Sequence, residues 1–104
     1  WVMGDIHGAY RALRQVLQRA HFDYTRDTLI CLGDVCDGWP DTHLCIEELR
    51  GIRHCIFLLG NHDFHTLQWA DTGWADEDWL LQGGAATRAA YNHQMPLEHV
   101  TFLK

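Results

Sequence analysis

The sequence predicts an α/β fold in which short parallel strands alternate with helices. Three short apolar runs, each followed by a glycine, are separated by two segments with the apolar spacing of a helix. The order strand, helix, strand, helix, strand is typical of a parallel sheet with right-handed crossovers. At 104 residues the chain has room for one small domain.

The first strand and its helix are expected at the start of the chain. Residues 1–3 have the character of a strand end, and an amphipathic helix follows, with apolar positions at Tyr10, Leu13, Val16, Leu17 and Ala20. A polar turn at 23–27 precedes the second strand at 28–32, which ends at Gly33.

The second helix and third strand repeat this unit. A helix is expected after Pro40, because proline is common in the first turn, and its apolar face holds Leu44, Cys45, Leu49 and Ile52. The third strand is expected at 55–59, before Gly60. After Asp63 the chain is expected to be mainly helical, with an excursion at 69–79 and helices near 85–92 and 96–103.

Composition and cysteine usage narrow the function classes. A net charge of −6 argues against non-specific nucleic-acid binding. No apolar run is long enough for a membrane span, and the start has no signal-peptide pattern, although a native N-terminus upstream of Trp1 is expected. The four cysteines form no CxxC pair, which disfavours zinc-ribbon and thiol-redox proteins. Buried free thiols, and hence a cytoplasmic protein, are expected, with Cys36 as a position where oxidation would matter.

Metal-competent residues follow all three strands. The runs are Gly4-Asp5-Ile6-His7-Gly8, then Gly33-Asp34-Val35-Cys36-Asp37-Gly38, then Gly60-Asn61-His62-Asp63. Parallel strands present their carboxyl ends at one sheet edge, so these residues are expected to converge there. A single such run is often a helix cap, but three at matching spacing are hard to explain as caps.

The side chains in these runs suit a pair of divalent ions. Carboxylate and imidazole together favour Mn, Fe or Zn, and Asp34 has two oxygens with which to bridge two ions. Asp5 and His7 are candidate ligands of one ion, and Asn61 of the other. Two such ions can clamp a phosphoryl group and lower the pKa of a water. His62 is a candidate general acid, with Asp37 holding its tautomer.

The motifs GDIHG, GDVCDG and GNHD, in this order, resemble those of the calcineurin-like metallophosphoesterase superfamily. Within it they are most similar to the phosphoprotein phosphatase branch and its bacterial relatives, which include symmetrical diadenosine tetraphosphatases. A fourth segment, Trp79 to Thr87 with Tyr91 after it, resembles the WLxxGGxxT…Y segment of bacterial members. The resemblance implies that residues 1–104 form the N-terminal part of a single metallophosphoesterase domain, half of an αββα sandwich. It also implies metal ligation by Asp5, His7, Asp34 and Asn61, and catalysis by His62 and Asp37.

Two departures from the family pattern stand out. Gly38 occupies the position where phosphatase relatives usually carry an arginine that grips phosphate, which argues against typical protein-phosphatase activity. The VHGG-like and GHT-like histidine motifs are missing, and His93 and His99 lack that context. Either the sequence is a fragment of a longer enzyme or a partner supplies the rest; we expect a fragment, since a half sheet would expose an apolar face.

Several alternatives remain open at this stage. The substrate is a phosphorylated small molecule, a nucleotide such as a diadenosine polyphosphate, or a phosphoprotein, and the main rival function is a non-catalytic binding module with a relic metal site. His65 is expected to be a solvated or capping residue. Trp69, Trp74 and Trp79 are either an aromatic wall beside the substrate or, as we expect, packing residues of a surface excursion.

Overall fold

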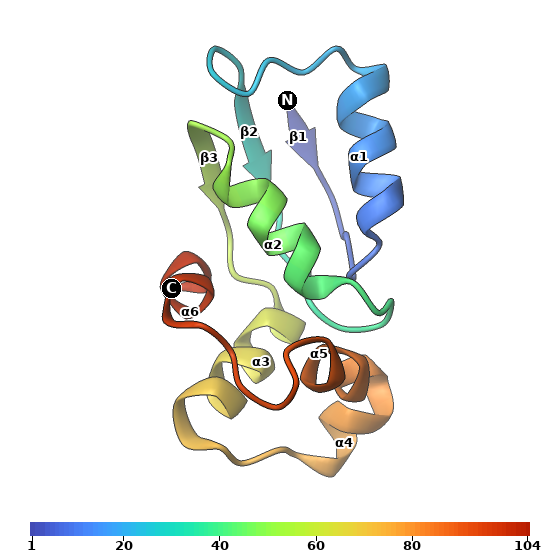
Figure 1. The fold of residues 1–104 in the computed structure, drawn as a ribbon, viewed down its shortest axis with the longest axis vertical. Helices are drawn as coiled ribbons and strands as arrows, with labels where there is room; N and C mark the ends of the chain where they lie inside the picture. The colour runs from blue at the N-terminus through green and yellow to red at the C-terminus, as the bar shows by residue number, and fades with distance from the viewer.

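The computed structural model describes residues 1–104 and confirms the strand and helix alternation. Strands β1 (Val2–Met3), β2 (Thr28–Cys31) and β3 (His54–Phe57) form a parallel sheet in the order β1-β2-β3 (Figure 1). Helix α1 (Tyr10–Arg19) joins β1 to β2, and α2 (Thr42–Arg50) joins β2 to β3. Two right-handed crossovers that proceed in one direction place both helices on the same face of the sheet.

The second part of the chain is helical and lies beyond the carboxyl ends of the strands (Figure 1). It consists of α3 (Asn61–Thr72), α4 (Glu77–Trp79), a wide turn η1 (Leu80–Gly84), α5 (Ala85–Ala90) and α6 (Leu97–Leu103). Helices α5 and α6 both contact α2, and α6 also contacts α3, so this part is packed on the sheet domain. None of the helices has the length and apolar character that crossing a bilayer requires.

The structure differs from the expectations at several places. Strand β3 ends at Phe57, two residues before the expected end, and Leu58 and Leu59 lie half-exposed beyond it. Helix α3 begins at Asn61 and continues to Thr72, so part of the expected excursion is helical. Its early start has a local cause, because the Asp63 carboxylate accepts the backbone N–H of Gly60 at 3.1 Å, as an acidic residue in a first turn often does. Val16, expected on the buried face of α1, is exposed.

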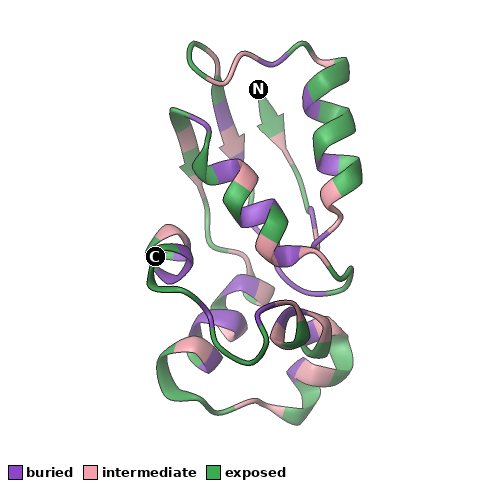
Figure 2. Ribbon diagram, in the orientation of Figure 1, coloured by how far each residue is buried: buried purple, intermediate pink, exposed green.

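The core lies between the sheet and the two crossover helices. One hydrophobic cluster includes Leu29 and Cys31 of β2, Leu13 and Leu17 of α1, and the fully buried Cys45, Ile46 and Leu49 of α2. Figure 2 shows buried segments on all three of these elements. Each large aliphatic side chain buried here contributes about 1.5–3 kcal/mol relative to exposure. The apolar spacing in the sequence thus positions the sheet, whose carboxyl ends carry the three motifs.

The opposite face of the sheet is apolar and uncovered. Val2, Ile30 and Ile56 are paired in register across the three strands, and they alternate with the buried residues of β2. Val2 is 64% exposed and Ile56 51% exposed, and Leu58 extends the same row. An αββα sandwich has a second sheet on this face, so the exposed row agrees with half of such a sandwich.

The uncovered face predicts the behaviour of residues 1–104 expressed alone. We expect this piece to self-associate and to bind a hydrophobic dye, because exposed apolar rows associate in water. Ile56→Glu should weaken the self-association about tenfold or more, since one aliphatic side chain contributes about 1.5–3 kcal/mol. Val16→Glu is the matched control, because Val16 is 52% exposed but lies on α1. Sedimentation that shows a monomer for the unmodified piece would contradict the prediction.

Candidate metal centre

Backbone hydrogen bonds bring the three motifs together at the carboxyl edge of the sheet. The backbone N–H groups of Ile6 and His7 both donate to the carbonyl of Asp34, at 3.0 and 2.9 Å. The third motif is equally close, because a side chain at Gly33 would collide with the backbone of Gly60. Only glycine permits this approach, and Gly33 also has a φ of +97°.

Three predicted site residues form one cluster. Ligand atoms of Asp5, His7 and Asp34 all lie within 4.8 Å of one another. The His7 Nδ1 atom is 3.0 Å from the carbonyl oxygen of Cys36. Because a carbonyl only accepts, Nδ1 carries the proton and donates, which leaves the lone pair on Nε2, 3.5 Å from the Asp5 carboxylate. A hydrogen bond of this kind orients many metal-binding histidines in proteins.

Asn61 lies beside the Asp34 carboxylate at the first turn of α3. One atom of its side-chain amide faces Asp34, 3.2 and 3.3 Å from the two carboxylate oxygens. If this atom is nitrogen, it donates to Asp34. If it is oxygen, the two groups face each other as acceptors and need a cation between them. The backbone N–H of His62 holds Asp34 in place by donating to it at 3.1 Å.

Three of the predicted site residues have left-handed backbone conformations. His7, Asp34 and Asp37 have φ values of +49°, +54° and +74°. For residues other than glycine this region costs about 1–3 kcal/mol each, and such residues cluster at functional sites. The surrounding hydrogen bonds therefore impose these conformations on the loops.

Asp63 is the residue that organises the middle motif, and the sequence analysis assigned it no role. Its fully buried carboxylate accepts the backbone N–H groups of Asp34, Val35 and Cys36 at 2.6, 3.0 and 3.0 Å, in addition to that of Gly60. Burial raises the pKa of Asp63, while the N–H groups of Cys36 and Gly60 oppose that shift. An acidic residue three positions after a strand-ending glycine was the available signal.

His62 and Asp37 form a second pair next to the cluster. The His62 Nδ1 atom lies 2.9 Å from Oδ2 of Asp37, which is fully buried. The His62 ring is 21% exposed and its centroid lies 5.0 Å from that of His7. The carboxylate therefore orients a partly accessible imidazole beside the cluster of candidate ligands.

Two further partners of Asp37 come from the fourth motif. The indole N–H of Trp79 and the hydroxyl of Thr87 both reach its carboxylate at 2.6 Å. Trp69 and Trp79 are buried, which confirms the expected packing role, whereas Trp74 is exposed. The only sequence signal for Trp79 and Thr87 was the resemblance of this segment to bacterial members of the family, and it assigned neither residue a role.

Burial of Cys36 argues against the oxidation sensitivity that its position in the middle motif suggested. Its side chain is fully buried, and burial raises its pKa well above the ordinary value. Burial likewise raises the pKa of Cys31 to about 11 and that of Cys45 to about 12. All four cysteines are free, and only Cys55 is partly exposed. Such thiols are poorly reactive, because the thiolate is the reactive form.

The position of the missing arginine lies beside the cluster. A Cβ atom at Gly38 would lie 3.5 Å from His7, and the next residue, Trp39, is 65% exposed. Trp39 and Arg11 line a hollow of about 460 Å³ that begins at Gly8, directly after His7. This surface therefore offers an aromatic plane and a cation close to the candidate ligands.

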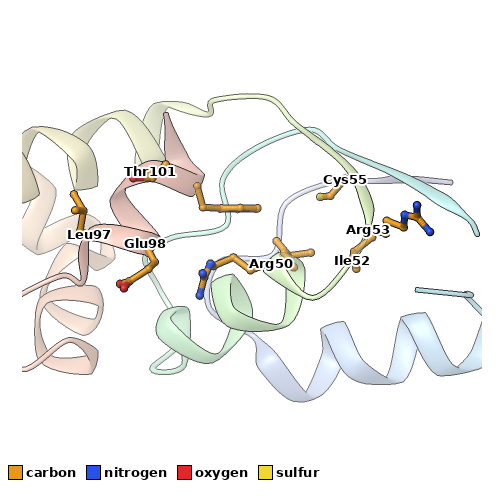
Figure 3. A pocket seen from close by; sticks show the side chains of 9 residues that line it. Arg50, Ile52, Arg53, Cys55, Leu97, Glu98 and Thr101 are labelled. Atoms are coloured by element: carbon orange, nitrogen blue, oxygen red, sulfur yellow. The ribbon is translucent and has the colours of Figure 1, made fainter. Parts of the chain in front are cut away.

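A separate hollow lies beside the C-terminal end of α2. It has a volume of about 520 Å³, is lined by residues of α2, β3 and α6, and includes Arg50, Arg53 and Glu98 (Figure 3). No predicted site residue lines it. The candidate chemistry therefore belongs to the open edge of the sheet.

Comparison with known proteins agrees with this geometry. A model of the calcineurin-like phosphoesterase family matches residues 1–99. The chain belongs to the calcineurin-like phosphoesterase family. The family resemblance and the α/β fold are thereby confirmed.

Two groups of curated relatives are similar to this family member. The symmetrical bis(5'-nucleosyl)-tetraphosphatase of Photorhabdus laumondii is 41% identical over 68 residues, which is 64% of this chain and 25% of the relative. Serine/threonine-protein phosphatase 1 of Salmonella typhimurium is 34% identical over 104 residues, which is 99% of this chain and 47% of the relative. The chain thus spans less than half the length of either protein.

Solved structures show the same likeness in three dimensions. A crystal structure described as a candidate diadenosine tetraphosphatase superposes with a TM-score of 0.72 at 28% identity, over 98% of this chain and 40% of that one. A metallophosphoesterase from Sphaerobacter thermophilus gives a TM-score of 0.66 at 28% identity, over 98% of this chain and 38% of that one. The chain therefore superposes on less than half of each of these two structures.

Proposed function

We propose that the protein hydrolyses phosphate esters with two divalent metal ions held at the carboxyl edge of its sheet. Asp5, His7 and Asp34 would hold one ion, and Asp34 and Asn61 the other. The observation that carries the proposal is the convergence of Asp5, His7 and Asp34, whose ligand atoms lie within 4.8 Å of one another. Residues 1–104 would be the N-terminal part of a single domain, whose remainder would supply further ligands.

The donor set fits divalent cations. Two carboxylates this close repel each other, and a cation between them removes the repulsion. The imidazole of His7 offers the lone pair of Nε2, because Nδ1 donates to Cys36, and the Asn61 amide meets Asp34 at 3.2 and 3.3 Å. Two bound ions supply positive charge for the phosphoryl group and acidify an attacking water. Mixed carboxylate and imidazole ligands favour Mn²⁺, with Fe or Zn as alternatives.

His62 would donate a proton to the leaving oxygen. Asp37 accepts from Nδ1 of His62 at 2.9 Å, which leaves Nε2 to carry the transferable proton. A positioned general acid of this type contributes about 10²–10⁴-fold to rate.

The cysteines support a reducing compartment such as the cytoplasm, because all four are free and three of them are buried.

The substrate class is supported by two separate observations. Phosphomonoesters and phosphoproteins fit the similarity to the Salmonella phosphatase. A diadenosine polyphosphate is the second candidate, because exposed Trp39 and Arg11 line a hollow that begins beside His7. The indole of Trp39 could stack on a nucleobase of such a substrate, and the guanidinium of Arg11 could bind the phosphates of the substrate. A relic binding module would have no need of the oriented His62–Asp37 pair.

The test is metal removal from the full-length protein. We expect chelation to abolish hydrolysis of para-nitrophenyl phosphate and diadenosine tetraphosphate, and Mn²⁺ to restore it, because the ions supply the charge for the phosphoryl group. Initial rates on both substrates and on a phosphopeptide, before and after chelation, measure this. Hydrolysis that persists after complete chelation, or is absent with every divalent ion, would sink the proposal.

A further inference from the structure

The Asp37 carboxylate receives more hydrogen bonds than the orientation of one histidine requires. Its Oδ2 atom accepts from His62 and from the Trp79 indole, at 2.9 and 2.6 Å. Its Oδ1 atom accepts from the Thr87 hydroxyl at 2.6 Å and lies 3.3 Å from that of Thr66. A fully buried carboxylate needs hydrogen-bond donors, and these donors together leave it no freedom to rotate.

The Thr87 hydroxyl has a defined direction. Its oxygen accepts the backbone N–H of Asp37 at 2.8 Å, and its proton goes to Oδ1 of the same residue. The hydroxyl of Thr42 lies 3.3 Å from that of Thr87 and must donate to it, because the only Thr87 proton is used. Thr87 therefore clamps both the backbone and the side chain of Asp37.

The Trp79 indole is fixed by the rest of the fourth motif. It packs against Trp69 in a tilted arrangement with ring centroids 5.8 Å apart, and a side chain at Gly84 would overlap it. Gly83, with a φ of +110°, accepts the backbone N–H of Gly38 at 3.2 Å, which ties η1 to the residue after Asp37. The two glycines thus bring the indole against the carboxylate.

We propose that Trp79 and Thr87 are positioning residues for proton transfer, which act by locking the Asp37 carboxylate so that it presents His62 to the leaving group. The proposal rests on the proposed function, because it assumes that His62 is the general acid. It goes beyond packing, since Trp69 is buried as deeply as Trp79 but makes no hydrogen bond to Asp37.

Leaving-group dependence separates positioning from packing. A general acid matters for a poor leaving group such as phenol and hardly at all for 2,4-dinitrophenol, which departs without a proton. In the full-length Mn²⁺ enzyme, Trp79→Phe should lower kcat about 10–30-fold with phenyl phosphate and less than about threefold with 2,4-dinitrophenyl phosphate. Trp69→Phe is the matched control and should affect both substrates alike.

Thr87 provides an independent version of the test. Thr87→Val keeps the shape of the side chain but removes the hydrogen-bond donor, so it should show the same selective loss of kcat with phenyl phosphate. Thr87→Ser keeps the hydroxyl and should therefore retain the wild-type ratio of the two rates. If Trp79→Phe does not fold, this pair of variants decides the question.

The His62→Ala variant distinguishes the acid role of His62 from the positioning role of Trp79 and Thr87. A larger selective loss in His62→Ala, together with a selective loss in the Trp79 and Thr87 variants, supports the proposal. A selective loss in His62→Ala with equal losses on both substrates in Trp79→Phe and Thr87→Val overturns the positioning role alone. Equal losses on both substrates in His62→Ala overturn the acid role of His62, and the positioning role with it.

Discussion

Replacing Asp34 by Asn is expected to lower kcat/KM of the full-length protein about 10³-fold or more, since the two ions supply several kcal/mol of charge stabilisation. Asp34 is the one residue that lies against both halves of the candidate centre. Its carboxylate belongs to the cluster with Asp5 and His7, and it faces the Asn61 amide at 3.2 and 3.3 Å. A neutral amide offers one oxygen where a bridging carboxylate offers two.

The Asp34→Asn substitution should disturb the fold only slightly. The remaining oxygen can still accept the backbone N–H of His62, and the backbone bonds of Asp34 are unchanged, so the melting temperature should stay close to that of the wild type. Asp71→Asn is the matched control, because Asp71 is an exposed carboxylate near the far end of α3. Equal rates for Asp34→Asn and the wild type would refute the bridging role.

Replacing Asp63 by Asn is expected to cost about 3–5 kcal/mol of stability, because buried N–H groups lose a charged acceptor and each costs about 1–3 kcal/mol. The substitution keeps the volume but points an NH₂ group at backbone N–H donors. The affected donors include those of Val35 and Cys36, both 3.0 Å from Oδ1. Metal affinity should fall as well, because the backbone N–H of Asp34 also donates to the Asp63 carboxylate.

Denaturant unfolding of the full-length protein measures this effect. Asp78→Asn serves as the control, since Asp78 is an exposed acidic residue in the first turn of α4, and it should change stability by less than about 0.5 kcal/mol. An Asp63→Asn protein with unchanged unfolding would show that the loop does not depend on that carboxylate.

The sheet and the positions of the candidate ligands were predictable because they follow from local patterns. Apolar runs that end in glycine mark parallel strands, and residues after such strands meet at one edge, as Asp5, His7 and Asp34 do. The boundaries were less predictable. The run that continues through Leu58 and Leu59 is apolar, but these two residues lie half-exposed after the end of β3.

The contacts that hold Asp37 were not predictable from spacing. Trp79 and Thr87 reach it from distant positions in the chain, and a tryptophan among acidic residues has the pattern of a surface excursion. The left-handed conformations of His7, Asp34 and Asp37 were equally hidden, because they arise from hydrogen bonds between loops and not from residue type.

The most direct test of the metal centre is anomalous diffraction from crystals of the full-length protein grown with Mn²⁺. We expect two peaks about 3.5–4 Å apart, both within ligand distance of Asp34, with the amide oxygen of Asn61 turned toward one of them. Peaks elsewhere, or an Asn61 nitrogen hydrogen-bonded to Asp34 with no ion beside it, would refute a two-ion centre at Asp34.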